Sequence, residues 1–376
     1  MAIALAKKID ADIVMASDPD ADRVGMACKD DKGEWVLING NQTCLIFLYY
    51  IIKNRIAMGK MQPNDFIVKT IVTTELIKAV ADKNKIEMRD CYTGFKWIAR
   101  EIRLSEGKQQ YIGGGEESYG FLAEDFVRDK DAVSACSLLA EICAWAKDQG
   151  KTLYDVLMEI YVEYGFSKET TVNVVKPGKS GAEEIKAMMD NFRANPPKEI
   201  GGSAVSLIKD YKTLELTDAQ GNVSKLDMPE TSNVLQYFTV DGTKISVRPS
   251  GTEPKIKFYI EVKGEMGCPK CYTSADAEAE KKWRQCASHS AFDRKEEKCV
   301  YSVRRGVTRE AAPLPFASVL KENLNKDLNP MVDEQNVCRE VKYRQIAVTH
   351  RLVDVNESRF IRSCSFVSVC FPQSAF

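Results

Sequence analysis

The chain has 376 residues, with 53 lysines and arginines against 54 aspartates and glutamates. This length leaves room for two or three domains and a substantial core. The balanced charge provides no field that would favour nucleic acid or an anionic membrane surface, so we expect neither partner. The longest apolar run, 44–52, is too short to span a bilayer, and no basic region precedes the apolar start of the chain. We therefore expect a cytoplasmic protein.

Apolar periodicity predicts an alternation of strands and helices. The expected strands are 13–16, 24–27, 35–38, 66–72, 86–90, 111–112, 170–175, 244–247 and 255–262, and the expected helices are 2–10, 39–58, 74–83, 94–104, 132–147, 153–164 and 182–192. Strands and helices that alternate favour a three-layer α/β domain. Beyond Gly165 several strands separated by turns favour a second, smaller α+β domain.

Three carboxylates at alternate positions follow the first strand: Asp18, Asp20 and Asp22. Pro19 disfavours continuation of a helix or a central strand, so we predict a loop at the strand's end. Converging carboxylates repel one another without a cation, which favours Mg²⁺, and Arg23 offers a bidentate grip on a phosphate that completes its shell. An EF-hand is excluded because glycine and glutamate are missing at its sixth and twelfth positions. A solvated acidic turn is the alternative.

Two further loops carry polar groups where predicted strands end. Thr93 and Gly94 open a helix whose N-terminus favours an anion, and Lys96 adds a mobile positive charge unless it is an ordinary surface lysine. In the following glycine-rich segment, glycines let the backbone approach a ligand, while Glu116 and Ser118 offer an acceptor and a donor to vicinal hydroxyls. The spacing does not match a nucleotide-binding GxGxxG, and a plain glycine-rich turn is the alternative.

The fourth loop lies between the two strands predicted at 244–247 and 255–262. It combines the guanidinium of Arg248 with the hydroxyls of Ser250 and Thr252 and with Gly251, whose N–H can point inward. These groups suit a phosphate cradle, with a tight hairpin connection as the alternative. Together the four loops indicate a metal and a phosphate at one end, hydroxyl recognition in the middle and a second phosphate grip, which describes a sugar phosphate.

Three of these motifs occur in the order and spacing of a known family. DPDADR (18–23), GEESYG (115–120) and RPSGTEPK (248–255), with TGFK (93–96) between the first two, resemble the α-D-phosphohexomutases of the phosphoglucomutase/phosphomannomutase type. The resemblance covers about 1–282. It implies phosphoryl transfer between the 1- and 6-positions of a hexose, such as glucose 1-phosphate to glucose 6-phosphate, through a phosphoserine, Mg²⁺ and glucose 1,6-bisphosphate.

The resemblance also assigns roles. Asp18, Asp20 and Asp22 would bind Mg²⁺, Arg23 would contact the phosphoserine, and Lys96 would transfer a proton or contact a phosphate. The implied substrate-binding residues are Thr93, Gly94, Glu116, Ser118, Arg248, Ser250, Gly251 and Thr252. The expected ligand is a hexose phosphate, and the expected oligomeric state is a monomer or dimer. The identity of the sugar, which could be glucose, mannose, glucosamine or a pentose, remains open.

The implied fold consists of mixed-sheet three-layer α/β domains of the phosphohexomutase type followed by a smaller α+β C-terminal domain. We expect the end of domain 2 with the metal loop at 1–40, domain 3 with the sugar-binding loop at 41–165 and domain 4 with the phosphate-binding loop at 166–282. Residues 283–376 resemble nothing in the family, and we expect a disordered or frameshifted tail. Nothing before Asp18 resembles the family's serine loop, so we expect little or no turnover by this chain alone.

Two other functions remain open. A phosphatase of the haloacid-dehalogenase type would use Asp18 as nucleophile and Asp20 as acid/base, but Asp22 stands where that motif has Thr or Val. A non-catalytic sugar-phosphate-binding fragment is the other alternative. The pair Cys268 and Cys271 is short of the two pairs that a zinc site usually needs.

Overall fold

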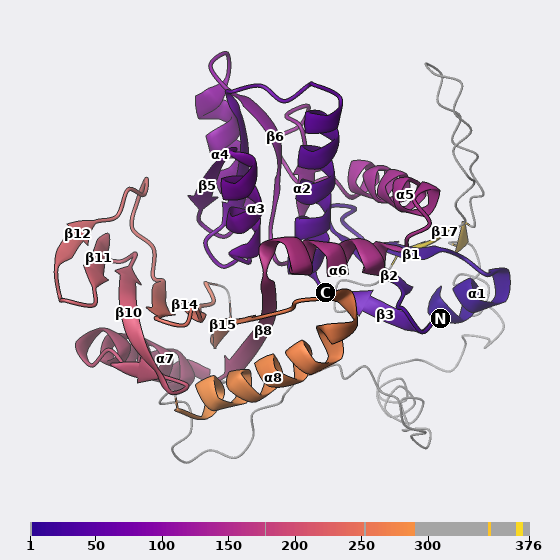
Figure 1. Ribbon diagram of the computed structural model, residues 1–376. Helices are drawn as coiled ribbons and strands as arrows, with labels where there is room; N and C mark the ends of the chain where they lie inside the picture. Colours follow the sequence, from indigo (N-terminus) through magenta and orange to yellow (C-terminus); the bar gives the residue numbers. More distant parts are fainter. Residues whose placement is uncertain (1, 177, 252, 290–344, 347–365, 371–376) are drawn as a thin grey trace, which may run out of the picture.

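The computed structural model describes residues 2–176, 178–251, 253–289, 345–346 and 366–370 (Figure 1). Its strands form three sheets, with helices packed against them, and this confirms the predicted α/β class. No helix in these ranges has the length and hydrophobicity that crossing a membrane requires.

The first sheet carries the acidic loop. Its order is β16-β17-β1-β2-β3, with bounds Gln345–Ile346, Phe366–Cys370, Ile13–Ser17, Val24–Lys29 and Trp35–Ile38, and helix α1 (Ala2–Ile9) packs beside it through Ala2 and Ala6. The predicted helix and the antiparallel pair β2–β3 are confirmed.

Part of the expected disordered or frameshifted tail, which begins at residue 283, has regular secondary structure. Helix α8 (Tyr272–His289) continues past that point, because Trp283 and Cys286 prolong its buried face. The segment Phe366–Cys370 forms β17, a parallel neighbour of β1. Its composition of apolar and β-branched residues suits a strand. The rest of the predicted tail lies outside the described residues.

The middle region is a three-layer α/β unit, as predicted. Its sheet has the order β5-β4-β6-β7, and the strands are β4 (Asp65–Thr70), β5 (Glu87–Cys91), β6 (Gln110–Gly115) and the antiparallel β7 (Phe121–Ala123). The helices are α2 (Gly40–Ala57), α3 (Leu76–Asn84), α4 (Phe95–Ser105), α5 (Ala132–Asp148) and α6 (Leu153–Tyr164). Alternate residues of β4 separate two cores: Ile67 packs into the core that contains α2 and α3, and Phe66 and Val68 pack with α4.

Local chemistry explains where these elements begin and continue. Asn39 and Gln42 form a capping box at the start of α2, so two backbone N–H groups without helical partners are satisfied. The strand predicted at 111–112 is longer in the structure, because β6 continues through the glycines to Gly115. A Cβ on Gly114 would lie 2.3 Å from the carbonyl oxygen of Val68, so this glycine is needed for close strand packing rather than for ligand approach.

The third sheet belongs to the C-terminal region and has eight strands. Its order is β12-β11-β10-β13-β14-β15-β8, with β9 beside β10. The strands are β8 (Phe166–Val175), β9 (Glu199–Ile200), β10 (Ser203–Asp210), β11 (Glu215–Asp218), β12 (Val223–Lys225), β13 (Leu235–Thr239), β14 (Lys244–Pro249) and β15 (Lys255–Gly264), and the helices are α7 (Gly178–Ala194), the 3₁₀ helix η1 (Pro269–Cys271) and α8.

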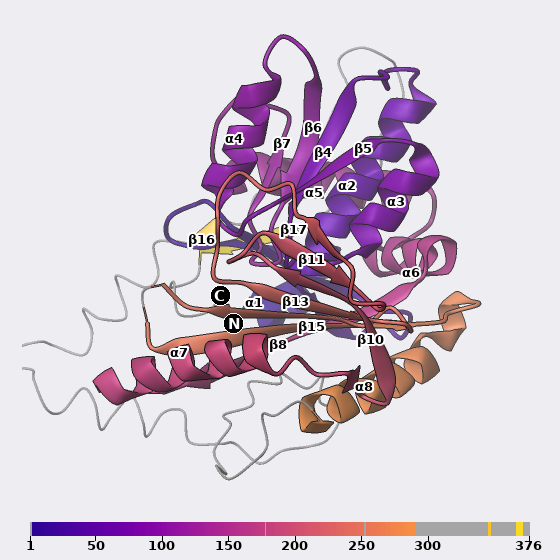
Figure 2. The same ribbon diagram turned by 90° about the vertical axis from the view of Figure 1, so that its left-hand side faces the viewer.

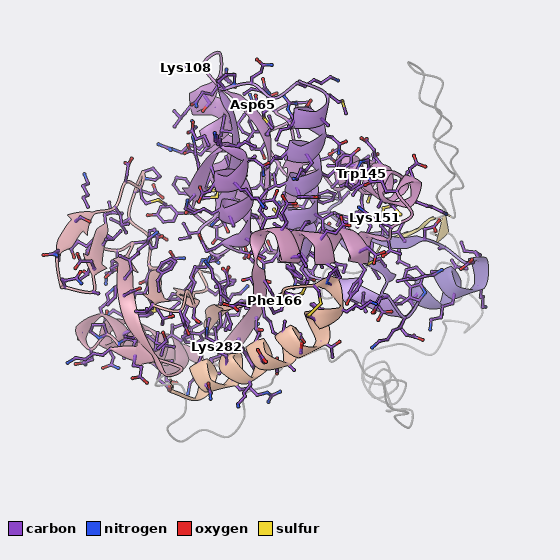
Figure 3. The ribbon with its side chains drawn as sticks, viewed as in Figure 1. Asp65, Lys108, Trp145, Lys151, Phe166 and Lys282 are labelled. Carbon is purple, nitrogen blue, oxygen red and sulfur yellow. A yellow bond between two sulfur atoms is a disulfide. The ribbon has the colours of Figure 1, made fainter. Side chains whose placement is uncertain are left out.

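The two faces of this sheet differ. Helices α7 and α8 cover one face (Figure 2), where residues such as Phe258, Ile260 and Trp283 are buried in the main core. The other face is turned toward the middle region. Figure 3 shows Asp65 and Lys108 at the far edge of the middle region, next to the starts of β4 and β6, so the carboxyl ends of these parallel strands point toward the C-terminal sheet. Ligands of α/β proteins bind at such strand ends.

Candidate active site

The acidic loop and the glycine-rich loop are joined through their backbones. Arg23 and Gly120 form an isolated antiparallel bridge, and the Val24 N–H donates to the Tyr119 carbonyl at 3.2 Å. The structure therefore brings together two loops that lie about a hundred residues apart in the sequence. This contact places the predicted metal-binding and sugar-binding residues in one site.

Asp18 is the anchor of the acidic loop. Its side chain is 1% exposed, and Oδ1 accepts hydrogen bonds from the N–H groups of Asp22 (3.1 Å) and Arg23 (3.3 Å). Asp20 is exposed at the tip of the loop. The Arg23 Nε lies 4.0 Å from Asp18 Oδ2 and 3.8 Å from Asp22 Oδ1. A buried carboxylate that accepts two backbone hydrogen bonds is a poor nucleophile, which disfavours the phosphatase alternative.

The metal role of the three aspartates remains a prediction. Across the described ranges, no three Asp, Glu, His or Cys side chains converge so that they could hold a metal ion. The donor set nevertheless suits Mg²⁺, which prefers carboxylate oxygens and few protein ligands. The buried Asp22 Oδ1 has no hydrogen-bond partner, so one ligand oxygen of the loop is unsatisfied.

Lys130 belongs to the site and was missed from the sequence. Its Nζ lies 2.6 Å from Asp22 Oδ2, and its side chain crosses the glycine-rich loop so closely that a Cβ on Gly120 would be 2.6 Å from Lys130 Cδ. Burial disfavours the ammonium, but Asp22 and Asp129 outweigh this effect and raise the pKa of Lys130. No motif surrounds Lys130 in the sequence, so only the fold could identify it.

The glycine-rich loop also contacts the loop that opens α4. Oε1 of Glu116 accepts a hydrogen bond of 2.8 Å from the Gly94 N–H, and Glu116 is only 3% exposed. Burial, followed by the negative charge of Glu117, raises the pKa of Glu116 above its usual range. Its second oxygen can accept a hydrogen bond from a sugar hydroxyl. Ser118, two residues further on, is half-buried.

Thr93 and Lys96 differ in how they contribute to this edge of the site. The Thr93 Oγ1 is buried without a hydrogen-bond partner, as expected of a group that awaits a ligand. Lys96 is exposed, and its Nζ lies 5.0 Å from the ring centroid of Trp97. A long exposed side chain is free to reach a ligand, but no described contact ties Lys96 to the other loops.

The fourth loop approaches the same site from the C-terminal sheet. Arg248 on β14 interacts with Tyr259 on β15, and burial together with the charge of Glu117 raises the pKa of Tyr259 to about 12. The Ser250 N–H donates to the Lys255 carbonyl at 2.8 Å, and a Cβ on Gly251 would meet open space. Thr252 lies outside the described residues. Arg248 and Glu117 thus both act on Tyr259, from opposite sides of the contact between the C-terminal sheet and the glycine-rich loop.

Two residues with left-handed backbones mark the contact between the loops. Ala21 has φ of 57° and Tyr119 has φ of 73°, a region that residues with a Cβ seldom adopt. Ala21 is tied to α5 by its carbonyl, which accepts from the Ala132 N–H at 3.1 Å. Such conformations persist where the surrounding structure enforces them, and they cluster at functional sites.

Comparisons with known proteins identify relatives of this chain. Residues 39–164 match the model for phosphoglucomutase/phosphomannomutase, alpha/beta/alpha domain III, and residues 172–266 match that of the C-terminal domain of the same family. The phosphoglucomutase of Staphylococcus aureus strain MRSA252 is 41% identical over 269 residues, which cover 71% of this chain and 47% of the relative. The strain N315 phosphoglucomutase is 40% identical over 268 residues, with 71% and 47% covered.

Among solved structures, parafusin, a phosphoglucomutase from Paramecium, aligns with a TM-score of 0.47 and 17% identity over 73% of this chain and 46% of that one. Two family models thus match separate parts of the sequence, and together they extend over most of the α/β fold. The chain belongs to the phosphoglucomutase/phosphomannomutase family. It spans about half the length of the curated relatives it matches. The predicted limits of its domains remain a prediction.

Proposed function

We propose that the chain binds a hexose phosphate and provides metal-, sugar- and phosphate-binding loops of a phosphohexomutase. The proposed reaction moves a phosphoryl group between the 1- and 6-positions of the hexose, with glucose 1-phosphate as the first substrate to test. One observation carries this proposal: the Glu116 carboxylate and the Gly94 N–H are hydrogen bonded at the point where the acidic loop meets the glycine-rich loop. The proposal combines the polar groups of all four loops, because a sugar with a phosphate at each end requires hydroxyl recognition between two phosphate grips.

Each loop has a physical role in this proposal. Glu116 and Ser118 orient the sugar through its hydroxyls, and Arg248 holds the phosphate that is not transferred by charge-assisted hydrogen bonds. Arg23 holds the phosphoryl donor. Lys96 would exchange a proton with the sugar oxygen that gains or loses the phosphoryl group, since its long exposed side chain is free to reach a ligand. Phosphoryl transfer depends mainly on positioning and neutralised charge, so loops of this composition suit it.

Asp18, Asp20 and Asp22 would hold Mg²⁺, with Lys130 as the cation that Asp22 contacts in the structure. When bound, the metal would neutralise charge on the transferring phosphoryl group. Glucose 1,6-bisphosphate is the proposed intermediate because the sugar must carry a phosphate at both ends between the two transfers. A cytoplasmic location and a monomeric or dimeric state remain predictions.

Binding tests the proposal directly. Isothermal titration with glucose 1-phosphate and Mg²⁺ should give a saturable heat, and Arg248→Met should weaken binding about ten- to hundredfold because it removes a charge-assisted grip. Arg100→Met is the matched control, since Arg100 lies on α4 and pairs with Glu101 at 2.9 Å. If the Arg248→Met and wild-type proteins bind equally, the phosphate cradle is not where we propose it.

Turnover separates a mutase from a binding protein. We expect little or no conversion of glucose 1-phosphate by the pure chain in a coupled assay with Mg²⁺ and glucose 1,6-bisphosphate. Robust turnover would contradict this expectation and would show that the chain holds its own phosphoryl acceptor. Binding without turnover would support the non-catalytic alternative for the chain on its own.

A further inference from the structure

A row of polar side chains lies on the face of the C-terminal sheet that is turned away from α7 and α8. We name this row the polar face; its members are Glu169, Gln236, Lys244, Ser246, Arg248, Tyr259 and Glu261. The strand register explains the row, because Glu169, Glu261 and Lys244 are direct neighbours across β8, β15 and β14. Lys244 is 1% exposed and Glu261 3%, so these charges are buried against another part of the protein.

The polar face contacts the turn of residues 71–75, which connects β4 to α3. The amide of Gln236 donates to the Ile71 carbonyl at 2.7 Å, and Lys244 Nζ donates to the Thr73 carbonyl at 2.8 Å. Glu261 accepts from the Glu75 N–H at 2.9 Å, at the start of α3. The C-terminal sheet therefore holds both the carbonyls and the N–H group of this turn.

Charge pairs strengthen the same contact. Lys244 Nζ lies 2.7 Å from Glu75 Oε1 and 3.1 Å from Glu261 Oε2, while Lys69 Nζ lies 3.1 Å from Glu75 Oε1 and 2.7 Å from Asp90. Buried charges keep a fixed geometry because any displacement leaves one of them unpaired. The turn is thus held rigidly with respect to the polar face.

The 71–75 turn and the end of β4 also contact the glycine-rich loop proposed to bind the sugar. The hydroxyls of Thr70 and Thr73 lie 3.2 and 3.3 Å from Glu117 Oε2, and they lie 2.8 Å from each other. Glu117 is the neighbour of Glu116, whose carboxylate accepts from Gly94. Hydrogen bonds therefore run from the sheet that carries Arg248 to Glu117, and the backbone connects Glu117 directly to Glu116, whose carboxylate is proposed to bind the sugar.

We infer that Gln236, Lys244 and Glu261, acting through the 71–75 turn and Thr73, are positioning residues that fix the sugar-binding loop relative to the phosphate grip of Arg248. The inference rests on the proposed function, since it assigns these residues to the same sugar phosphate site. Its consequence is selective: a break in the linkage weakens recognition of a sugar and its phosphate together, while a phosphate alone is bound as before.

Thr73→Val is the sharpest test because it removes one hydroxyl and keeps the size of the side chain. We expect its dissociation constant for glucose 1-phosphate to rise about three- to tenfold, with that for inorganic phosphate unchanged within about twofold. Thr73→Ser should restore the wild-type value. Thr243→Val is the matched control, since the Thr243 side chain is buried and its Oγ1 has no hydrogen-bond partner.

Hydrogen exchange tests the linkage without a ligand. The Gly94 amide reports on the sugar-binding loop because it donates to Glu116. We expect this amide to exchange several-fold faster in Thr73→Val than in the wild type or in Thr243→Val. In Glu261→Gln we expect faster exchange at both Glu75 and Gly94, provided that circular dichroism shows a folded protein; if it does not, Thr73→Val alone decides.

The two readouts separate the inference from the function on which it rests. If the wild type binds no glucose 1-phosphate, the proposed function fails, and the exchange comparison still decides whether the linkage exists. If the wild type binds, the inference requires both faster exchange at Gly94 and the selective loss of glucose 1-phosphate affinity in Thr73→Val. The absence of either change, or an equal loss of inorganic phosphate, overturns it.

Discussion

On the side of the C-terminal sheet that faces α7 and α8, residues such as Ile260 and Phe258 are buried among apolar neighbours, whereas the opposite side buries Lys244 and Glu261. Alternate residues of the same strands therefore meet two different environments. Apolar contacts are non-directional and tolerate small shifts. Buried charges require partners at fixed distances, so the polar face determines the position of the middle region far more strictly than the apolar face determines that of the helices.

Because the two faces are held by different interactions, they should respond differently to mutation. Loss of an apolar side chain removes a contact area and leaves a cavity, while loss of one charge leaves others buried without compensation. Four changes test the comparison.

Lys244→Met should have the largest effect. It leaves Glu75 and Glu261 buried without the ammonium that lies within 3.1 Å of both, and we expect a loss of about 3–5 kcal/mol in the free energy of unfolding. Urea denaturation measures it. Lys209→Met is the control, because Lys209 on β10 forms no ion pair with a described carboxylate. Equal losses in the two variants would mean that the buried charges do not define the polar face.

Ile260→Ala tests the apolar face of the same strand. Ile260 is 2% exposed, and its truncation should lower the free energy of unfolding by about 3 kcal/mol through lost burial and an added cavity. Val240→Ala, at a residue 75% exposed, should change it by less than about 0.5 kcal/mol. The same urea denaturation experiment gives both values. A larger loss in Ile260→Ala than in Lys244→Met would reverse the comparison.

Glu169 makes the stability of the polar face depend on pH. Burial and the charge of Glu261, its direct neighbour across β8 and β15, raise the pKa of Glu169 above its usual value of about 4.5. The folded state thus binds this proton more tightly than the unfolded state does. The stability that protonated Glu169 contributes is therefore fully present below pH 4.5 and is lost as pH rises through the folded pKa. Hydrogen bonds from Thr74 and Ser167 lower the pKa of Glu169 but do not offset burial and the charge of Glu261.

We expect the wild type to lose about 1–2 kcal/mol more stability than Glu169→Gln between pH 5 and pH 9, because glutamine has no proton to release. Urea denaturation of both proteins at several pH values in this range measures the difference. Parallel curves for the two proteins would show that Glu169 has an ordinary pKa and would remove it from the polar face.

Lys168→Met should have the smallest effect. Lys168 is the neighbour of Glu169 on β8, but it points to the opposite face and pairs with Asp276 (2.7 Å) and Glu280 (3.2 Å) of α8 at partly exposed positions. Solvent screens these pairs, so we expect a loss of at most about 1 kcal/mol. The value from thermal or urea denaturation should lie well below that of Lys244→Met. A similar loss in both would mean that burial does not distinguish the two lysines.

Much of the site could be predicted because its chemistry is local in the sequence. The motifs at 18–23, 93–96, 115–120 and 248–255 each place several polar groups within a few residues, and the order of strands and helices followed from apolar periodicity. The family match at 39–164 and 172–266 includes the last three of these motifs. Such motifs can be recognised without knowledge of the tertiary structure, because each is defined by residues that are neighbours in the sequence.

The errors have physical causes. The glycines before Glu116 were assigned to ligand approach, but Gly114 also lets β6 pack closely against Val68 of β4, and Gly113 and Gly115 lie against α2 and Phe121, which periodicity does not reveal. Lys130 and Glu117 were not recognised as partners of the site because their contacts, with Asp22 and with Thr70 and Thr73, depend on loops that meet only after folding. The carboxylates of the acidic loop were identified from their spacing. Their spacing does not reveal that the Asp18 carboxylate accepts a hydrogen bond from the Asp22 N–H within its own loop.

The elements, the chemistry of the loops and the family could be predicted from the amino-acid sequence, because they depend on neighbouring residues and on side-chain type. The tertiary structure alone decided which of these groups meet. Glu169, Lys244 and Glu261 form one row only because β8, β14 and β15 pair in one register, and a shift of one residue would turn each of them to the apolar face. The register is set by contacts between distant segments, and so is the position of the 71–75 turn against the polar face.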